Sequence, residues 1–337
     1  MADKVTIAVD AMGGDDAPSV VLDGVAQALA ADEGLHVVLC GPADVAEPFA
    51  AAHERCEARA TTEVIGMGEH PAEAVRKKKD SSIVVGCRLV KEGEAQGFFS
   101  AGSTGACLAA GTLVMGRIKG VARPALATVI PSPVRPVVMC DVGANADCKP
   151  SYLVQFAQMA TIYAEKIVGI ERPRAALLNI GEEEAKGSQF AQEAHALLRE
   201  QLPNFAGNAE GGDILAATYD VIVTDGFTGN VCLKTIEGTS KTLFKTLKGI
   251  MMKTPLTKLG ALAIKGGLKE LMAQVSPDTY GGAPLLGVKG ACIVGHGSSN
   301  AYAVKNGVLT TAGVVRAGVS EIIAQTVAAG ASSATME

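Results

Sequence analysis

The sequence predicts a three-layer α/β/α sandwich, a Rossmann-like fold built on a largely parallel sheet. Two observations lead to this fold class. Short apolar runs alternate with longer segments of helical periodicity along the whole chain, and this alternation is typical of βαβ units. Most of the short runs are also continuously apolar rather than alternating, as expected of strands that helices cover on both faces.

The first strand is predicted at 5–11, where VTIAVDA runs into a pair of glycines. The other strands have a similar form and are expected at 36–41, 97–102, 125–130, 136–143, 174–181, 220–226 and 291–297. Helices are expected between them, where apolar residues recur every three or four positions. They lie near 18–32, 43–55, 82–93, 104–116, 151–168, 185–200, 228–252, 255–275 and 309–329. The stretches 131–133 and 203–213 are expected to be surface turns.

The 337 residues suffice for one large domain or two ordinary ones, each with a substantial core. The sequence contains no long linker and no obvious internal repeat. We therefore expect a single catalytic domain over 1–337, with two lobes as an alternative and a lobe boundary near 145–150.

Composition and charge exclude several function classes. Aromatic residues make up 4 % of the chain and the formal charge is −5, which argues against stacking platforms for single strands and against nucleic-acid binding in general. The eight cysteines are scattered without a Cys-x-x-Cys pair, so we expect reduced core thiols and no metal site. No signal peptide or membrane-length apolar run occurs, which predicts a cytoplasmic protein.

Four predicted strand ends are rich in Gly, Ser, Thr and Asn, and ligands of open α/β sheets bind at such ends. In SAGSTGA, 100–106, Ser103, Thr104 and Gly105 open a helix; they form either an anion site or an ordinary N-cap. In TDGFTGN, 224–230, Asp225 and Gly226 turn the chain towards Asn230. Asp225 is either a helix cap or an acceptor for a substrate.

The third and fourth junctions are GHGSSN, 295–300, and AVDAMGGDDAP, 8–18. His296 lies between glycines and is suited to stabilising an oxyanion; Ser298, Ser299 and Asn300 follow it. No P-loop occurs and GHGSSN falls short of a dinucleotide motif. We therefore expect several loops to converge on a phosphate without a nucleotide. The run RKKKDSS, 76–82, either adds positive charge there or forms a solvated face.

The stretch LLNIGEEEAKG, 177–187, places three glutamates next to one another at an expected helix start. Neighbouring helical residues point about 100° apart, so the three carboxylates cannot share one metal ion; the helix dipole explains one or two of them. Lys186 follows Glu182 by four residues, on nearly the same helical face. We expect an electrostatic role for Lys186, because a covalent acyl-lysine would be a stable amide.

Residues 231–275 carry eight lysines and two glutamates, which gives this segment a charge of +6 in a chain of −5. Two amphipathic helices account for it. They either pack on the core with a solvated lysine face, or form a surface for an anionic membrane or an acidic protein. Their apolar stripe also suits a fatty chain. The expected contact residues are Lys241, Lys245, Lys248, Lys258, Lys265, Lys269, Leu268 and Leu271.

Six blocks in one order resemble the bacterial phosphate acyltransferases (PlsX) along nearly the whole chain: AVDAMGGDDAP, AVRKKKDSS, AGSTGA, LLNIGEEEAKG, VTDGFTGNV and YGGAPLLGVKG with GHGSSNA. The resemblance implies transfer of a long-chain fatty acyl group from acyl-acyl-carrier-protein to inorganic phosphate, giving acyl phosphate for phospholipid synthesis. It also implies a homodimer, peripheral membrane attachment, and an isocitrate/isopropylmalate-dehydrogenase-like fold shared with phosphotransacetylases.

This chemistry requires neither a cofactor nor a strong base, because phosphate is largely dianionic near neutral pH and a thiolate leaves readily. Gripping and aiming the phosphate should matter more. The expected catalytic residues are Lys186, His296, Asp225 and Asn230. The expected phosphate and substrate ligands are Ser103, Thr104, Gly105, Asn179, Gly181, Gly226, Ser298, Ser299 and Asn300. The alternatives are a phosphotransacetylase acting on short acyl-CoA and a membrane scaffold without catalysis.

Overall fold

The structure is a computed structural model, and it describes residues 4–333. One sheet runs through the molecule, with the strand order β3-β2-β1-β4-β11-β10-β5-β6-β9-β7-β8. The strands are β1 Val5–Asp10, β2 Leu35–Gly41, β3 Cys56–Ala60, β4 Gly97–Ser100, β5 Ala125–Ile130, β6 Val137–Cys140, β7 Ala175–Leu178, β8 Phe205–Ala209, β9 Val221–Val223, β10 Ala283–Leu286 and β11 Ala291–Val294.

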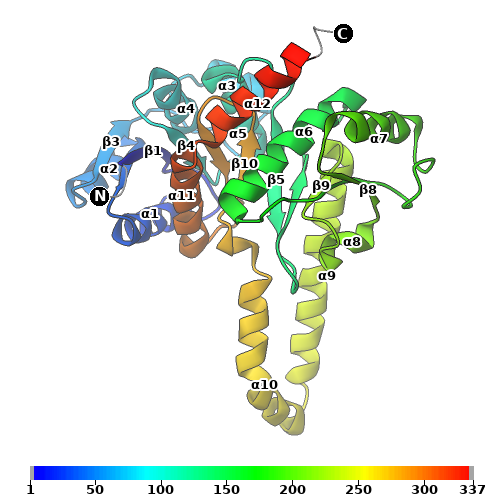
Figure 1. The fold of residues 1–337 in the computed structure, drawn as a ribbon. Helices are drawn as coiled ribbons and strands as arrows, with labels where there is room; N and C mark the ends of the chain where they lie inside the picture. Colours follow the sequence, from blue (N-terminus) through cyan, green and yellow to red (C-terminus); the bar gives the residue numbers. More distant parts are fainter. Residues whose placement is uncertain (1–3, 334–337) are drawn as a thin grey trace.

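Helices cover both faces of this sheet (Figure 1). They are α1 Ser19–Ala31, α2 Ala43–Ala51, α3 Pro71–Lys77, α4 Ser82–Glu92, α5 Thr104–Ala110, α6 Pro150–Tyr163, α7 Gln189–Gln201, α8 Gly211–Ala216, α9 Gly226–Met251, α10 Pro255–Gln274, α11 Ala301–Arg316 and α12 Val319–Ser333. The π-helical turns η1 Gly111–Met115 and η2 Ala164–Val168 extend α5 and α6, and a short 3₁₀ turn, η3 Pro277–Thr279, precedes β10.

Both faces of the sheet are buried under helices. Neighbouring residues of a strand point to opposite sides of the sheet, so they enter different hydrophobic clusters. Ile7 and Val9 of β1 belong to one hydrophobic cluster, whereas Ala8 between them belongs to the other. Such strands must be apolar at every position, and this is the pattern that predicted them. The expected three-layer α/β/α sandwich with a largely parallel sheet is confirmed.

The direction of the strands changes within the sheet. The five strands from β3 to β11 are mutually parallel. β10 is antiparallel to both of its neighbours, and β5 is antiparallel to β6. The last four strands, β6 to β8 in sheet order, are again parallel to one another but opposite to the first five. The carboxyl ends of the two strand groups therefore lie at opposite ends of the sheet along the strand direction.

Several elements differ from the expectation. The sequence pattern did not predict β3 and β8, the two edge strands, which are short and contain polar residues, nor β10, whose four residues include a proline. It also missed α3 and α8. The stretch 203–213 is not a simple turn, since it contains β8. The helix expected at 309–329 is two helices, α11 and α12, which are separated at Gly318 with its φ of +62°.

Helix α7 begins later than expected, and this changes the environment of Lys186. Ser188 is its N-cap, with Oγ accepting a hydrogen bond from the Ala191 N–H at 3.3 Å. The residues from Glu182 to Lys186 consequently form a loop instead of a first helical turn. The expectation that Glu182 and Lys186 share a helical face is wrong.

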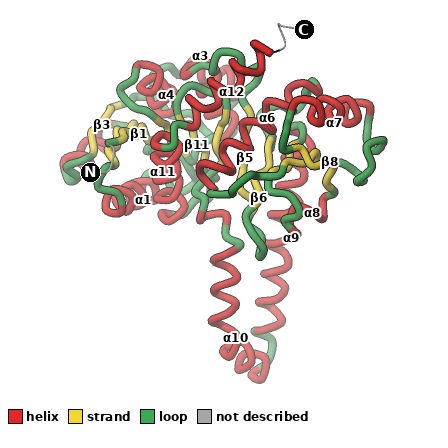
Figure 2. The backbone as a smooth tube through the Cα atoms, viewed as in Figure 1, coloured by secondary structure: helices red, strands yellow, loops and turns green. Residues whose placement is uncertain are grey.

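Helices α9 and α10 form a hairpin that projects from the body of the molecule (Figures 1 and 2). Their bounds agree with the expected 228–252 and 255–275 to within two residues. No residue of α10 is buried, and apolar side chains such as Leu256, Leu262 and Ile264 are more than half exposed. The interpretation of these helices as core-facing is wrong for α10, whereas Cys232, Leu233 and Ile236 at the start of α9 do pack against the core.

Candidate active site

Three loops meet at the carboxyl ends of the neighbouring strands β1, β4 and β11. Asp10 ends β1, and its Oδ2 accepts a hydrogen bond of 2.6 Å from the Ser100 hydroxyl at the end of β4. Ser100 Oγ in turn accepts the Gly102 N–H at 3.0 Å, and Asp10 Oδ1 accepts the Met12 N–H at 3.0 Å. Asp10 and Ser100 are both buried. This network fixes the two loops that leave β1 and β4.

Gly13 lets these two loops approach each other closely. A Cβ at Gly13 would lie 2.6 Å from the Gly102 nitrogen and 2.8 Å from Ser100 Oγ. Any side chain at position 13 would therefore push the β1 loop away from the β4 loop. Gly13, the first residue of the Gly-Gly pair after β1, is therefore required for backbone packing.

The His296 turn joins the same group. The Gly295 N–H donates to the Ser100 carbonyl at 2.8 Å, and the Asp15 N–H donates to the Gly297 carbonyl at 2.7 Å. His296 Nδ1 lies 2.8 Å from Ser298 Oγ and accepts the Ser298 N–H at 3.2 Å. A backbone N–H can only donate, so the proton of the neutral imidazole lies on Nε2. His296 thus presents an exposed ring whose Nε2–H is a donor.

Ser103 and Asn300 cap the two helices that start at this edge. Ser103 Oγ accepts the Ala106 N–H at 3.4 Å at the start of α5, and Asn300 Oδ1 accepts the Ala303 N–H at 2.9 Å at the start of α11. The N-cap alternative is confirmed for Ser103. Thr104 is exposed beside it. Both helix starts lie where β4 and β11 end, and we call residues 102–105 and 296–300 together the anion cradle, after the role proposed for them below.

A second group of polar loops lies at the carboxyl ends of β6, β9 and β7. Asp141 follows β6 and is buried; its carboxylate accepts the N–H groups of Leu126, Gly143, Ala144 and Asn145. The Asn145 carbonyl accepts the Gly226 N–H at 2.8 Å, which attaches the start of α9 to this turn. Asp225 caps α9 by accepting the Thr228 N–H at 2.9 Å, so the cap alternative is confirmed. Asn230 packs beside Gly143.

The 179–187 loop completes this second group at the end of β7. Asn179 Oδ1 accepts the Ile180 N–H at 2.9 Å, and its Nδ2 donates to the Lys186 carbonyl at 3.2 Å. The aliphatic stem of Lys186 lies over Gly181, since a Cβ there would be 3.0 Å from Lys186 Cγ. The Lys186 side chain is exposed. Asn179 thus closes the loop that presents Lys186.

The three adjacent glutamates have separate surroundings. Glu184 forms an ion pair with Arg199 of α7 at 2.6 Å, and Glu183 Oε2 lies against Gly181. Within residues 4–333, no group of three or more His, Cys, Asp or Glu side chains is placed to hold a metal ion. Glu184 thus ties the 179–187 loop to α7.

The four expected strand-end junctions do not meet at one edge of the sheet. The loops 8–18, 100–106 and 295–300 belong to the first group, whereas 224–230 belongs to the second, together with the separate 179–187 loop. Strand direction places the junctions in two groups within this chain, because the antiparallel insertion of β10 and β5 reverses the strands. The convergence of their loops on one anion stays a prediction. The basic run at 76–79 is partly neutralised, since Lys77 pairs with Glu73 and Lys78 with Glu69.

Sequence reasoning missed Asp10 and Asp141 as organisers of the two groups. The signal was present, since each acid ends an apolar strand and precedes a glycine by two or three residues. Burial raises the pKa of Asp10, against hydrogen bonds from Ser100, Ser82 and Met12 that lower it. Burial likewise raises the pKa of Asp141.

Asp10→Asn is expected to change the pH dependence of stability. The raised pKa of folded Asp10 means that its contribution to stability is complete below the unfolded value of 3.8 and is lost as pH rises through the folded value. The variant lacks this loss, so its stability relative to wild type should rise from acidic to neutral pH. Urea unfolding of both proteins across this pH range measures the difference between their free energies of unfolding. A difference that stays constant with pH would contradict the burial of an ionisable Asp10.

The fold is that of phosphotransacylases. A phosphotransacetylase from Streptococcus pyogenes superposes with a TM-score of 0.59 at 17 % identity, covering 93 % of this chain and 94 % of its own. A branched-chain phosphotransacylase from Enterococcus faecalis V583 gives 0.57 at 13 % identity, covering 92 % and 99 %.

The family follows from sequence. A family model described as "Fatty acid synthesis protein" matches residues 5–322. The phosphate acyltransferase of Desulfitobacterium hafniense (strain Y51) is 50 % identical, over 94 % of this chain and 96 % of its own. The phosphate acyltransferase of Nitratidesulfovibrio vulgaris (strain DP4) is 46 % identical, over 96 % and 95 %. The chain belongs to this phosphate acyltransferase family, and it is an acyltransferase.

Membrane spans were sought in the described part of the chain. No single helix there is long and apolar enough to cross a membrane, although the bent pair Ala301–Arg316 and Val319–Ala329 meets the length and composition criteria together.

Proposed function

We propose that this acyltransferase moves a long-chain fatty acyl group from acyl-acyl-carrier-protein to inorganic phosphate, and that the acyl phosphate serves phospholipid synthesis. The observation that carries the donor assignment is the groove between α9 and α10. It has a volume of about 900 Å³ and is lined by apolar side chains, among them Leu262, Leu268 and Met272, together with lysines. An acidic carrier with an apolar chain matches this combination of charge and hydrophobicity.

Six of the eight expected contact residues line this groove: Lys241, Lys245, Lys248, Lys258, Lys265 and Leu268. Lys269 and Leu271 belong to α10 but lie outside the lining. The five lysines come from both helices, so their charges add across the groove. A shorter acyl-CoA, the rival donor, would leave much of this surface unused.

We assign phosphate to the anion cradle. The start of α11 and the hydroxyl of Ser299 offer donors to an anion, and Nε2–H of His296 offers another, whereas the Ser298 hydroxyl donates to His296 Nδ1 and orients the ring. The same donor can stabilise the tetrahedral oxyanion or protonate the leaving thiolate. Lys186, Asp225, Asn230 and the amides near Gly181 and Gly226 remain candidates on the second group of loops.

We also propose that the whole chain works as one catalytic domain. β10 and β11 come late in the sequence, yet they lie between β4 and β5 in the middle of the sheet. Without β10 and β11, the strands from β3 to β4 would not be connected to the strands from β5 to β8 in the sheet.

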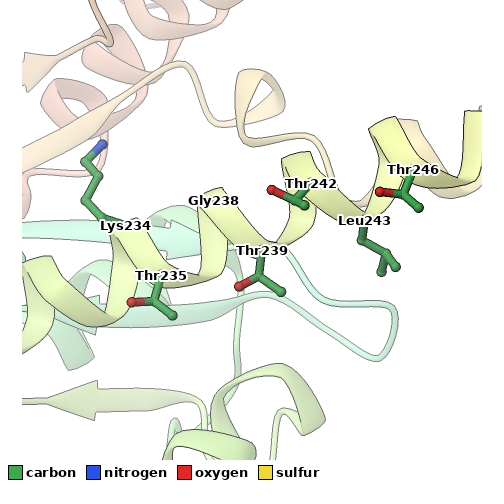
Figure 3. Close-up of a pocket in the computed structure, with 7 residues that line it drawn as sticks. All are labelled: Lys234, Thr235, Gly238, Thr239, Thr242, Leu243 and Thr246. Carbon is green, nitrogen blue, oxygen red and sulfur yellow. The ribbon is translucent and has the colours of Figure 1, made fainter. Parts of the chain in front are cut away.

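A homodimer is proposed through the threonine-rich face of α9. Thr235, Thr239, Thr242 and Thr246 follow one another along this helix, with Gly238 between them (Figure 3). Their spacing of four, three and four residues places them on one face. Together with Lys234 and Leu243 they line a depression of about 580 Å³. Small side chains allow another helix to approach closely.

Charge reversal in the groove is expected to distinguish the two donors. Lys245→Glu should raise KM for palmitoyl-acyl-carrier-protein roughly tenfold, because it opposes an acidic partner, and should change KM for palmitoyl-CoA less. Lys253→Glu, in the exposed turn between α9 and α10 and outside the lining of the groove, serves as the control. Equal effects of Lys245→Glu on both donors would contradict carrier recognition at this site.

The same lysines support peripheral attachment to an anionic membrane at the cytoplasmic side. Each lysine near such a surface contributes about 1 kcal/mol, and the exposed leucines of α10 add apolar contact. Cosedimentation with vesicles tests this attachment. Binding to phosphatidylglycerol vesicles that weakens with salt supports it; equal binding to phosphatidylcholine vesicles would contradict it.

A further inference from the structure

Residues 62–70 form a loop over the His296 turn, which we call the covering loop. It connects β3 to α3 and carries Met67 between Gly66 and Gly68. Met67 reaches Gly297, since a Cβ at Gly297 would lie 3.0 Å from Met67 Cε. The Met67 side chain is nevertheless 54 % exposed. Its contact with the anion cradle is therefore a surface contact and not part of the core.

The covering loop is held in place from outside by Lys78. The Lys78 ammonium donates to the Val64 carbonyl at 2.7 Å and to Glu69 Oε1 at 2.7 Å. Glu69 Oε1 also accepts the Gly66 N–H at 2.6 Å. Lys78 thus joins the two sides of the loop on either side of Met67. The hydrogen bond from Lys78 and the one from Gly66 hold the pKa of Glu69 below its usual range.

Asp80 fixes the first residues of the covering loop. Its Oδ2 accepts the Thr62 N–H at 2.9 Å and the Thr62 hydroxyl at 2.6 Å. The Asp80 N–H donates to Glu63 Oε2 at 3.0 Å. Both ends of the loop are therefore tied to the segment that immediately follows α3.

The covering loop ends against the other half of the anion cradle. Pro71, the first residue of α3, packs on Gly105 at the start of α5, where an added Cβ would lie 2.5 Å from Pro71 Cγ. Gly297 follows β11 and Gly105 follows β4. Met67 and Pro71 together span the two loops to which phosphate is assigned above.

We propose that the covering loop keeps water away from the acyl group at the anion cradle, with Met67 as the covering side chain and Lys78 as a positioning residue. This inference rests on the proposed function. Water and phosphate are competing nucleophiles for the thioester carbonyl. Attack by water forms a C–O bond, breaks the C–S bond and transfers a proton to the thiolate, so the products are a fatty acid and a thiol. A flexible, apolar thioether next to the cradle disfavours this reaction.

The test measures thiol release from palmitoyl-acyl-carrier-protein with and without phosphate, in the wild type and in Met67→Ala, Met67→Leu and Lys78→Ala. Met67→Ala and Lys78→Ala should raise the ratio of phosphate-independent to phosphate-dependent release about tenfold, since both open the site to water. Met67→Leu should keep the wild-type ratio, because leucine preserves the apolar volume. Lys77→Ala is the matched control, since Lys77 pairs with Glu73 and not with the covering loop.

The outcomes separate this inference from the proposed function. A wild-type enzyme that releases no thiol in response to phosphate contradicts the proposed function itself. Phosphate-dependent release by the wild type, with an unchanged ratio in Met67→Ala, overturns only the role of the covering loop. Equal ratios for Lys78→Ala and Lys77→Ala overturn the positioning role of Lys78. A merely structural loop would change the melting temperature without changing the ratio.

Discussion

Gly229→Ala is expected to destabilise the protein by at least about 3 kcal/mol, because it overpacks a backbone contact that cannot relax locally. An added Cβ would overlap the Asp141 carbonyl oxygen and would approach Thr224 Cγ2 at 2.9 Å. The Asp141 segment cannot yield, since its carboxylate accepts several backbone N–H groups. The first turn of α9 would have to move away from β6.

Urea unfolding of Gly229→Ala measures this loss, and Gly249→Ala is its matched control on the same helix. No heavy atom outside the helix lies within 4 Å of a Cβ built at Gly249. Alanine is favoured over glycine in an exposed helix interior by up to about 1 kcal/mol, so this variant should be slightly more stable than wild type. A Gly229→Ala protein as stable as wild type would contradict the packing of α9 against the Asp141 turn.

Lys186→Met is expected to lower kcat/KM for palmitoyl-acyl-carrier-protein and phosphate by about a hundredfold or more, the scale for removing an electrostatic stabiliser of the transition state. Within residues 4–333, Lys186 has no ion-pair partner, and its exposed side chain rises from a loop closed by Asn179. Methionine preserves the stem that lies over Gly181. The fold should therefore remain intact, with an unchanged melting temperature.

Glu182→Gln is the control for Lys186→Met. The structure places Glu182 in a loop and not on a helical face with Lys186, so this variant should keep nearly the wild-type kcat/KM. Near-normal turnover of Lys186→Met would remove Lys186 from the mechanism. A loss in Glu182→Gln as large as that in Lys186→Met would restore the pairing of the two residues.

The sequence predicted the elements whose pattern is local. Continuous apolar runs identified the central strands, and the periodicity of 231–275 identified α9 and α10 to within two residues. The pattern did not determine which way these helices face. An amphipathic stripe has the same period whether it packs on a core or meets another surface, and only the arrangement of the chain shows that α10 projects.

The grouping of the loops required information that is not local. Strand direction depends on the insertion of β10, which has four residues and resembles a loop with a proline. The sequence located most of the polar junctions but not the two edges to which they belong. The start of α7 was within reach of sequence reasoning, since Ser188 is a favourable N-cap residue, but the adjacent glutamates suggested an earlier start.

Acyl-phosphate formation tests the central claim most directly. Enzyme is incubated with palmitoyl-acyl-carrier-protein and phosphate, the product is trapped with hydroxylamine, and palmitoyl-CoA is assayed in parallel. We predict phosphate-dependent acyl hydroxamate from the carrier-protein thioester, and less from the CoA thioester. No product from either thioester, with a folded protein, would contradict the assignment and would favour a membrane scaffold. Product from CoA alone would favour a phosphotransacetylase.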